Sequence, residues 1–354
     1  MAIHQISNIN MTGMCSAVPA GNRVITDEYS NMGKEFVDRV ACTTGVLKRH
    51  LAPAHICASD LAYSALKTLI EELNWSRDSI DCVVLVTQTP DYLLPNTGSV
   101  LHQRLGLNKN TIVFDVNLGC SGYIYGLWLV ANLLNRGMLK RGLIVVADTI
   151  SKIVNDSDDS LKLLFGDAAS ATALEYSEDG GKIDFILGND GSKFDSLIVP
   201  SGLFRSLSKN DDIEVEKKLK FMKKKDKQYL TIDGPEMMNF ILSEVPCALA
   251  SLLESAKMDK SNVDYWVMHQ ANEVVLKNLA KKIGICLERM PFSLNEFGNT
   301  SSASIPLTIS YKLREILRSK KLNLMLTGFG VGLSWGCSLI RCGNMVMPSI
   351  VYVD

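Results

Sequence analysis

Short runs of apolar, β-branched residues alternate along this chain with longer stretches whose apolar positions have helical spacing. The short runs predict buried strands at 81–87, 111–116 and 142–148. The longer stretches predict helices at 59–74, 98–105 and 122–136. Because alternation of strands and helices is typical of parallel strand pairing, the pattern predicts an α/β fold.

The second half of the chain repeats this pattern faintly. A helix and a polar turn precede Asp81 at the head of one apolar strand, and a helix at 244–257 precedes Asp264 at the head of another. We interpret the repeat as an internal duplication of two related α/β halves, residues 1–180 and 181–354.

Charge is nearly balanced over the 354 residues. Lysine and arginine total 37, aspartate and glutamate total 38, and the formal net charge is −1. Without a global basic field, neither nucleic acid nor a membrane is expected as a principal partner. The exception is a charged insertion near 205–228, interpreted as a solvated helix or loop, or alternatively as a cationic edge for an acidic carrier protein.

The nine cysteines are scattered, with no C-x-x-C pair, and no His, Cys and acidic residues cluster at metal-ligand spacing. This distribution favours reduced thiols and predicts no metal site. The first residues lack the basic-then-apolar form of a signal peptide, and no apolar run reaches the roughly 20 residues of a spanning helix. We therefore expect a cytoplasmic protein.

Cys120 directly follows one predicted strand and opens a predicted helix. The positive end of a helix dipole lowers the pKa of a thiol and favours the nucleophilic thiolate, so Cys120 is a candidate nucleophile. Gly119 and Gly122 would let a substrate approach closely. A packed core cysteine is an equally good interpretation of these residues alone.

Three motifs in the second half could supply hydrogen-bond donors. His269 ends an apolar strand, where open α/β sheets place ligands, although a lone histidine is more often structural. Asn299 could donate two hydrogen bonds, or cap the helix that follows it. The glycine-rich loop at 328–332 could present backbone N–H groups as an oxyanion hole. His50, in a Lys-Arg-His run, is instead expected to be exposed.

Together, in the order cysteine, histidine, asparagine and glycine-rich loop, these motifs are specific. Phe165-Gly-Asp-Ala-Ala, His269-Gln-Ala-Asn and Gly298-Asn-Thr-Ser-Ser-Ala-Ser make the sequence resemble the thiolase-like condensing enzymes. The most similar member type is β-ketoacyl-acyl-carrier-protein synthase III, which initiates fatty acid biosynthesis. The resemblance extends from Thr44 to Arg341 and implies a thiolase-like fold, a five-layer αβαβα arrangement and a homodimer.

The resemblance also implies a reaction in two halves. The Cys120 thiol accepts an acyl group from a primer thioester, and a malonyl thioester then loses CO2 and attacks the acyl-enzyme to give a 3-oxoacyl thioester. His269 and Asn299 would hydrogen-bond the malonyl thioester oxygen, and the backbone N–H groups of Cys120 and Val331 would form the oxyanion hole for acyl transfer. No cofactor is implied beyond the coenzyme A or acyl carrier protein that bears each substrate.

Other positions match family residues that contact the substrate and the carrier. Phe329 and Gly330 would line the substrate site. Leu94 aligns with the residue that reaches across the dimer to cap the partner's acyl pocket, and a leucine there leaves room for a longer or branched acyl group. Acyl carrier protein would dock on a basic helix face that contains Lys277, Lys281 and Lys282.

The sequence departs from the family where the family binds coenzyme A. Arg39 and Thr43 stand in place of a Trp and an Arg that sandwich the adenine, Asp159 replaces a further Arg, and Pro235 replaces an Asn. Val274 replaces an Arg used in carrier docking. We therefore expect that a carrier protein, and not coenzyme A, delivers the primer. The same departures leave open whether the enzyme serves a specialised pathway or housekeeping fatty acid synthesis.

Two alternatives remain beside condensation. An acyltransferase that moves the acyl group to an alcohol or amine is the runner-up, although such members often change the His or the Asn. An inactive partner subunit is disfavoured because Cys120 is present. Thiolase chemistry needs a second catalytic cysteine, and neither Cys337 nor Cys342 has the family's Cys-x-Gly setting.

Overall fold

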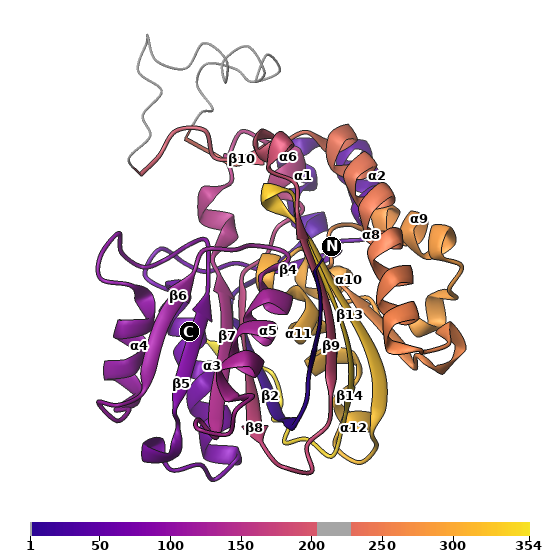
Figure 1. The fold of residues 1–354 in the computed structure, drawn as a ribbon. Helices are drawn as coiled ribbons and strands as arrows, with labels where there is room; N and C mark the ends of the chain where they lie inside the picture. Colours follow the sequence, from indigo (N-terminus) through magenta and orange to yellow (C-terminus); the bar gives the residue numbers. More distant parts are fainter. Residues whose placement is uncertain (1, 204–227) are drawn as a thin grey trace.

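Two large sheets organise the computed structural model, which describes residues 2–203 and 228–354 (Figure 1). The N-terminal sheet has, in spatial order, strands β15 (Val351–Val353), β2 (Ile9–Pro19), β8 (Ala168–Tyr176), β7 (Arg141–Asp148), β5 (Cys82–Val86) and β6 (Ile112–Val116). The C-terminal sheet has strands β1 (Ala2–Ile6), β9 (Ile183–Asn189), β14 (Ser334–Cys342), β13 (Leu322–Gly330) and β12 (Tyr265–Met268). Two-stranded pairs are formed by β3 (Asn22–Val24) with β4 (Lys48–His50), and by β10 (Leu197–Ile198) with β11 (Thr231–Ile232).

Helices lie outside and between the two sheets, which confirms the five-layer αβαβα arrangement (Figure 1). The outer face of the N-terminal sheet is covered by α3 (Ala58–Glu72) and α4 (Thr97–Leu105), and that of the C-terminal sheet by α8 (Gly234–Ala256) and α9 (Glu273–Ile283). The central layer contains α5 (Gly122–Leu134) and α11 (Ser304–Lys312). The other α-helices of the described residues are α1 (Tyr29–Met32), α2 (Lys34–Thr44), α6 (Asp159–Lys162), α10 (Leu294–Phe297) and α12 (Arg314–Leu317).

Parallel pairing follows the predicted strand–helix alternation. β5 pairs in parallel with both β6 and β7, and β12 pairs in parallel with β13. Strands β5, β7, β12 and β13 are buried between helical layers, which explains their continuous apolar runs, whereas β6 lies at the edge of its sheet and is only partly buried. The end strands exchange partners: β1 pairs with β9 of the C-terminal sheet, and β15 pairs with β2 of the N-terminal sheet. The proposed boundary at residue 180 therefore leaves one short strand of each half in the other sheet.

Matching contacts recur in the two halves. Asp81 Oδ2 accepts a hydrogen bond from the Arg141 N–H at the start of β7, at 2.9 Å. Asp264 Oδ2 accepts one from the Asn323 N–H at the head of β13, at 2.7 Å. Gly106 and Gly284 end α4 and α9 in the left-handed region, with φ of +62° and +66°. These equivalent contacts are consistent with an internal duplication.

Helix α8 differs from expectation in length and character. It begins at Gly234, ahead of the predicted start at 244, because Asp233 caps it by accepting a hydrogen bond from the Glu236 N–H. Contrary to the expectation from apolar run length, α8 is long and apolar enough to cross a membrane by length and composition. It packs against α9 and β14 as an outer-layer helix. The charged insertion lies almost entirely outside the described residues.

Candidate active site

A cavity of about 1000 Å³ brings Cys120, His269 and Asn299 together. Cys120 lies between β6 and α5, His269 directly follows β12, and Asn299 precedes α11. The cavity therefore opens where strands of both sheets end, the position that open α/β sheets use for ligands.

The Cys120 thiol is buried beside two backbone N–H groups. The N–H groups of Cys120 and Val331, together with the Ser301 side chain, hydrogen-bond the sulfur and lower its pKa. Burial has the larger effect, and with the nearby Asp148 charge it raises the pKa of the Cys120 thiol to about 12. Desolvation thus outweighs the hydrogen bonds to the sulfur, contrary to the expectation of a thiolate stabilised by the helix dipole.

His269 contacts an aromatic ring and a hydroxyl, and its imidazole also hydrogen-bonds the Ser301 backbone. Its imidazole meets the Phe329 ring edge to face, with centroids 5.5 Å apart. Its Nδ1 lies 2.7 Å from the Ser304 Oγ, which also accepts a hydrogen bond from the Gln270 N–H at 3.3 Å. Burial lowers the pKa of His269 to about 3, so the ring is neutral at ordinary pH.

Asn299 is fixed by the Phe-Gly-Asp segment. Its backbone N–H donates to the Leu164 carbonyl at 2.9 Å, and its carbonyl accepts from the Gly166 N–H at 3.0 Å. The side-chain Oδ1 accepts from the Ser301 N–H at 3.0 Å, and Nδ2 donates to the Ala271 carbonyl at 3.3 Å. One Nδ2 hydrogen is thus left for a ligand. Asn299 does not cap α11, whose N-cap is Ala303.

The loop that follows β13 approaches the thiol closely. Phe329, Gly330 and Val331 all line the cavity. A Cβ at Gly330 would lie 2.7 Å from the Cys120 Cβ and 3.0 Å from its Sγ. Only glycine therefore fits at this position without moving the nucleophile.

Sequence reasoning missed a buried carboxylate behind the site. Asp148 ends β7 and accepts hydrogen bonds from the Gln88 N–H at 2.8 Å and the Ser302 Oγ at 2.6 Å. Burial raises the pKa of Asp148. Through these two hydrogen bonds, the Asp148 carboxylate connects the end of β5 to the loop that carries Asn299. The serine-rich run at 301–304 was the available signal for these contacts of Asp148.

The prediction that His50 is exposed is wrong. The side chain is buried, and its Nδ1 lies 2.7 Å from the Pro19 carbonyl oxygen.

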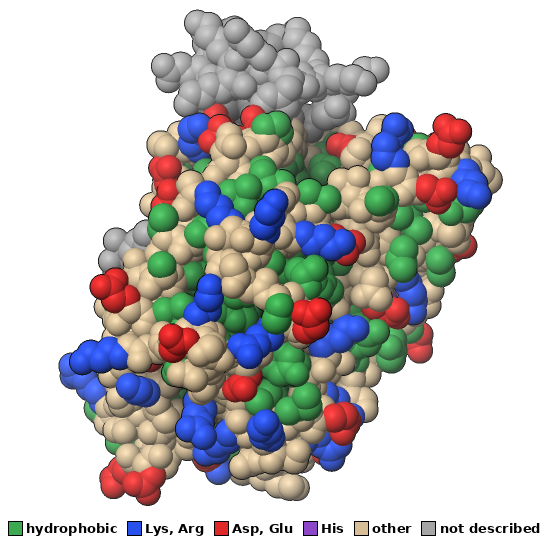
Figure 2. Space-filling model, turned by 90° about the vertical axis from the view of Figure 1, so that its right-hand side faces the viewer, with side chains coloured by type: hydrophobic (Ala, Val, Ile, Leu, Met, Phe, Trp, Pro, Cys, Tyr) green, Lys and Arg blue, Asp and Glu red, His purple; other side chains and the backbone are tan. Residues whose placement is uncertain are grey.

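The remaining predicted residues lie near the cavity mouth or away from it. Leu94 is 78% exposed and does not line the cavity of its own chain. Helix α9 begins at the cavity with Val274 and continues outward to a surface that exposes Lys277, Lys281 and Lys282. Lys277 forms an ion pair with Glu273 at 2.7 Å. On the face in Figure 2, basic side chains lie among acidic ones and form no continuous patch.

Of the four positions at which the sequence departs from the family pattern for coenzyme A binding, two line the cavity and two do not. Thr43 and Pro235 line the cavity, whereas Arg39 and Asp159 do not. Thr43 donates its hydroxyl to the Arg39 carbonyl, within helix α2, at 2.9 Å. Neither a threonine nor a proline side chain provides an aromatic or guanidinium plane on which an adenine could stack.

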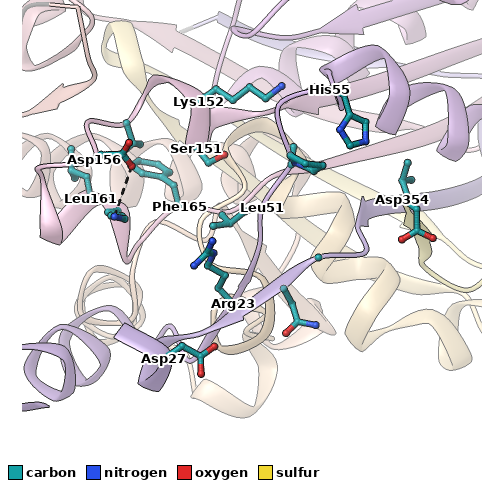
Figure 3. A pocket seen from close by; sticks show the side chains of 17 residues that line it. Arg23, Asp27, Leu51, His55, Ser151, Lys152, Asp156, Leu161, Phe165 and Asp354 are labelled. Carbon is teal, nitrogen blue, oxygen red and sulfur yellow. Dashed lines mark ion pairs between the residues drawn. The ribbon is translucent and has the colours of Figure 1, made fainter. Parts of the chain in front are cut away.

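A second cavity, of about 820 Å³, adjoins the first and shares Leu161 and Phe165 with it (Figure 3). Its charges are mixed: Arg23 and Lys152 lie among several aspartates. The Lys152 ammonium donates a hydrogen bond to the Ile56 carbonyl at 2.6 Å, so it already has a partner within the protein.

Residues 2–203 and 228–354 contain no cluster of three or more His, Cys, Asp and Glu side chains suited to a metal ion.

Comparisons with known proteins agree with this geometry. The family model for 3-oxoacyl-[acyl-carrier-protein] synthase III matches residues 114–191, and the model for its C-terminal part matches residues 253–342. A putative 3-oxoacyl-[acyl-carrier-protein] synthase 3 from Campylobacter jejuni is 30% identical over 96% of each chain. A β-ketoacyl-[acyl-carrier-protein] synthase III from Halalkalibacterium halodurans is 31% identical over 95% of this chain and 97% of its own.

Solved structures extend the agreement to the fold. The crystal structure of a 3-oxoacyl-(acyl-carrier-protein) synthase from Burkholderia xenovorans superimposes with a TM-score of 0.93. It is 38% identical and covers 99% of this chain and 98% of its own. The chain therefore belongs to the 3-oxoacyl-acyl-carrier-protein synthase III family of the thiolase superfamily.

Proposed function

We propose that the protein is a condensing acyltransferase that joins an acyl group to a malonyl thioester and releases CO2. The observation that carries the proposal is the convergence of a thiol, a neutral imidazole and a carboxamide in one cavity. A transfer to an alcohol or amine needs no donor pair to stabilise an enolate, so this convergence favours condensation.

The first half-reaction transfers the acyl group. The Cys120 sulfur attacks the thioester carbonyl carbon, the bond from that carbon to the carrier sulfur breaks, and the thiol proton leaves on the carrier thiol. The backbone N–H groups of Cys120 and Val331 already point at the sulfur, and they are placed to hold the oxyanion of the tetrahedral intermediate.

The second half-reaction needs donors for an enolate. As the malonyl thioester loses CO2, negative charge develops on its carbonyl oxygen. The resulting carbanion attacks the acyl carbon on Cys120, the bond from that carbon to the Cys120 sulfur breaks, and the released thiolate takes up a proton from solvent to restore the thiol. His269 Nε2, left available because Ser304 engages Nδ1, and the free Nδ2 hydrogen of Asn299 supply these donors. Donors of this kind contribute roughly 2.7–4 kcal/mol each.

The carrier proteins that bear the malonyl group and the primer both bind at helix α9. This helix starts at the cavity with Val274 and exposes its lysines on the following turns, so an acidic carrier there could deliver its arm directly. The positions at which family members hold adenine are Arg39 and Thr43 here, which supports a carrier-bound primer.

The functional unit is a homodimer whose two chains meet along β6. The protein acts in the cytoplasm. β6 is an edge strand of its sheet, and Ile112 on it is 42% exposed. Tyr92, Leu93 and Leu94 form an exposed apolar loop near this edge. Antiparallel pairing of two β6 edges would cover both features and bring Leu94 toward the partner's cavity.

The test supplies an acyl-carrier primer and malonyl-carrier and measures CO2 release together with the 3-oxoacyl-carrier product. Equal amounts of both are expected. An acyl transfer to an added alcohol or amine that proceeds without malonyl-carrier and without CO2 would instead establish the acyltransferase alternative.

A further inference from the structure

Two carboxamide side chains lie on the side of the catalytic cavity formed by the N-terminal sheet. Gln88 follows β5, Asn117 follows β6, and both line the cavity that contains Cys120. Gln88 Nε2 donates to Asn117 Oδ1 at 3.3 Å. Within residues 2–203 and 228–354 neither side chain makes another hydrogen bond, so Gln88 Oε1 and Asn117 Nδ2 offer an acceptor and a donor side by side.

The carboxamide pair is close to the nucleophile. A Cβ at Gly119 would lie 2.3 Å from Gln88 Oε1, and Gly119 directly precedes Cys120. Because consecutive Cα atoms are ~3.8 Å apart, Gln88 Oε1 lies within roughly 8 Å of the Cys120 Cα. The first few carbons of an acyl group on the Cys120 sulfur can reach it.

Much of the remaining lining of the cavity is apolar and comes from both halves of the chain, with Ile150 and Leu164 from the first and Ile232 and Ile241 from the second. The first turn of α9 also lines the cavity, at Val274 and Val275. The lysines proposed to bind the carrier continue along α9, so the carrier arm enters from this side. The carboxamide pair comes from the other half of the chain and lies beside Cys120, to which the acyl group of the primer is attached.

We propose that the primer's acyl group carries a hydroxyl on one of its first carbons, and that Gln88 and Asn117 select for it. This inference rests on the proposed function. A hydroxyl both donates and accepts, so it can satisfy Gln88 Oε1 and Asn117 Nδ2 together. Gln88 is half-buried and Asn117 is exposed, and a saturated acyl group offers neither of them a donor or an acceptor. Sites built to bind a hydroxyl discriminate against analogues that lack it.

The test compares acylation of Cys120 by thioesters of pantetheine, which avoids the choice between coenzyme A and carrier. The butyryl thioester is compared with the 3-hydroxybutyryl thioester, and the decanoyl thioester with the 3-hydroxydecanoyl thioester. For each thioester, kcat/KM for acylation of Cys120 is measured by intact-protein mass spectrometry. The wild type is expected to favour the hydroxylated member of at least one pair by tenfold or more. The double variant Gln88→Met with Asn117→Leu, similar in volume but apolar, should lose this preference.

Gln103→Met is the matched control, because Gln103 is exposed on α4 and does not line the cavity. It should keep the wild-type preference. Equal or better acylation by the plain thioesters in the wild type would overturn the inference and leave the condensing function intact. Failure of every thioester to acylate Cys120, on pantetheine and on acyl carrier protein alike, would instead overturn the proposed function itself.

Discussion

At the scale of single residues, burial controls the two groups that matter most. It raises the pKa of Cys120 to about 12 and lowers the pKa of His269 to about 3, so both side chains are neutral at pH 7. The thiolate must therefore form as the substrate binds, when the carbonyl and the backbone N–H groups share its charge. The sequence could place Cys120 at a helix start, but it could not reveal how completely the thiol is desolvated.

The protonation state of Cys120 gives a pH prediction. Because its pKa is raised, the thiolate fraction is small at pH 7 and grows about tenfold per pH unit until the pKa is approached. Alkylation of Cys120 by iodoacetamide should still accelerate at pH 10, where free cysteine in solution has levelled off. A plateau at or below pH 8 would contradict this assignment and restore the helix-dipole prediction.

Ser304 should act as a positioning residue for His269. Ser304→Ala removes the hydroxyl 2.7 Å from His269 Nδ1, and we expect condensation to slow about tenfold while acylation of Cys120 changes little. The imidazole pKa should shift as well, which the pH profile of condensation would report.

Ser310→Ala is the matched control for that substitution. Ser310 is buried on the same helix and hydrogen-bonded to Ser16 at 2.9 Å, remote from the imidazole. If both alanine variants slowed condensation equally, the effect of Ser304 would be general loss of packing.

At the scale of elements, apolar periodicity placed the three strands and three helices that it predicted in the first half of the chain within one or two residues of their observed ends. The predicted strand 142–148 is Arg141–Asp148, and the predicted helix 122–136 is Gly122–Leu134. Helix α8 was predicted too short because its first turns contain a Gly-Pro pair, which weakens the helical pattern although Asp233 caps it. The Phe-Gly-Asp motif was recognised, but its contact with Asn299 depends on tertiary pairing that no local pattern contains.

The loop after β13 offers an element-scale prediction. Gly330→Ala would place a methyl group 2.7 Å from the Cys120 Cβ, so the loop or the nucleophile must shift. We expect acylation of Cys120 to fall at least a hundredfold, since catalytic geometry tolerates displacements well below 1 Å.

Gly181→Ala is the matched control, because a Cβ there would meet its nearest atom, the Ile9 carbonyl oxygen, at an ordinary 3.6 Å. Its acylation rate should match the wild type. Wild-type acylation in Gly330→Ala would show that the loop does not constrain the thiol.

At the scale of the whole molecule, β6 is one of the four end strands of the two large sheets. The faint repeat suggested two halves, and the family resemblance supplied the number of layers. The exchange of β1 and β15 between the sheets was not predictable, because strands of five and three residues have no pattern that identifies their partners. The edge of β6 remains available for a second chain.

The open edge predicts a dimer that one charge should disrupt. Ile112→Arg places a buried charge at the proposed interface, so the chain should sediment as a monomer and lose condensing activity. Ile316→Arg is the control: Ile316 is 38% exposed on α12, and its variant should sediment like the wild type. A wild-type chain that sediments as a monomer, or an Ile112→Arg chain that remains dimeric, would contradict the β6 interface.

The most direct test of the central claim separates the two half-reactions by intact-protein mass spectrometry. Wild type, Cys120→Ala and His269→Ala are each given a carrier-bound primer and then malonyl-carrier. We predict that wild type and His269→Ala gain the acyl mass, that Cys120→Ala does not, and that only wild type loses the mass again with release of CO2. Discharge of the acyl group by His269→Ala at the wild-type rate would contradict the account.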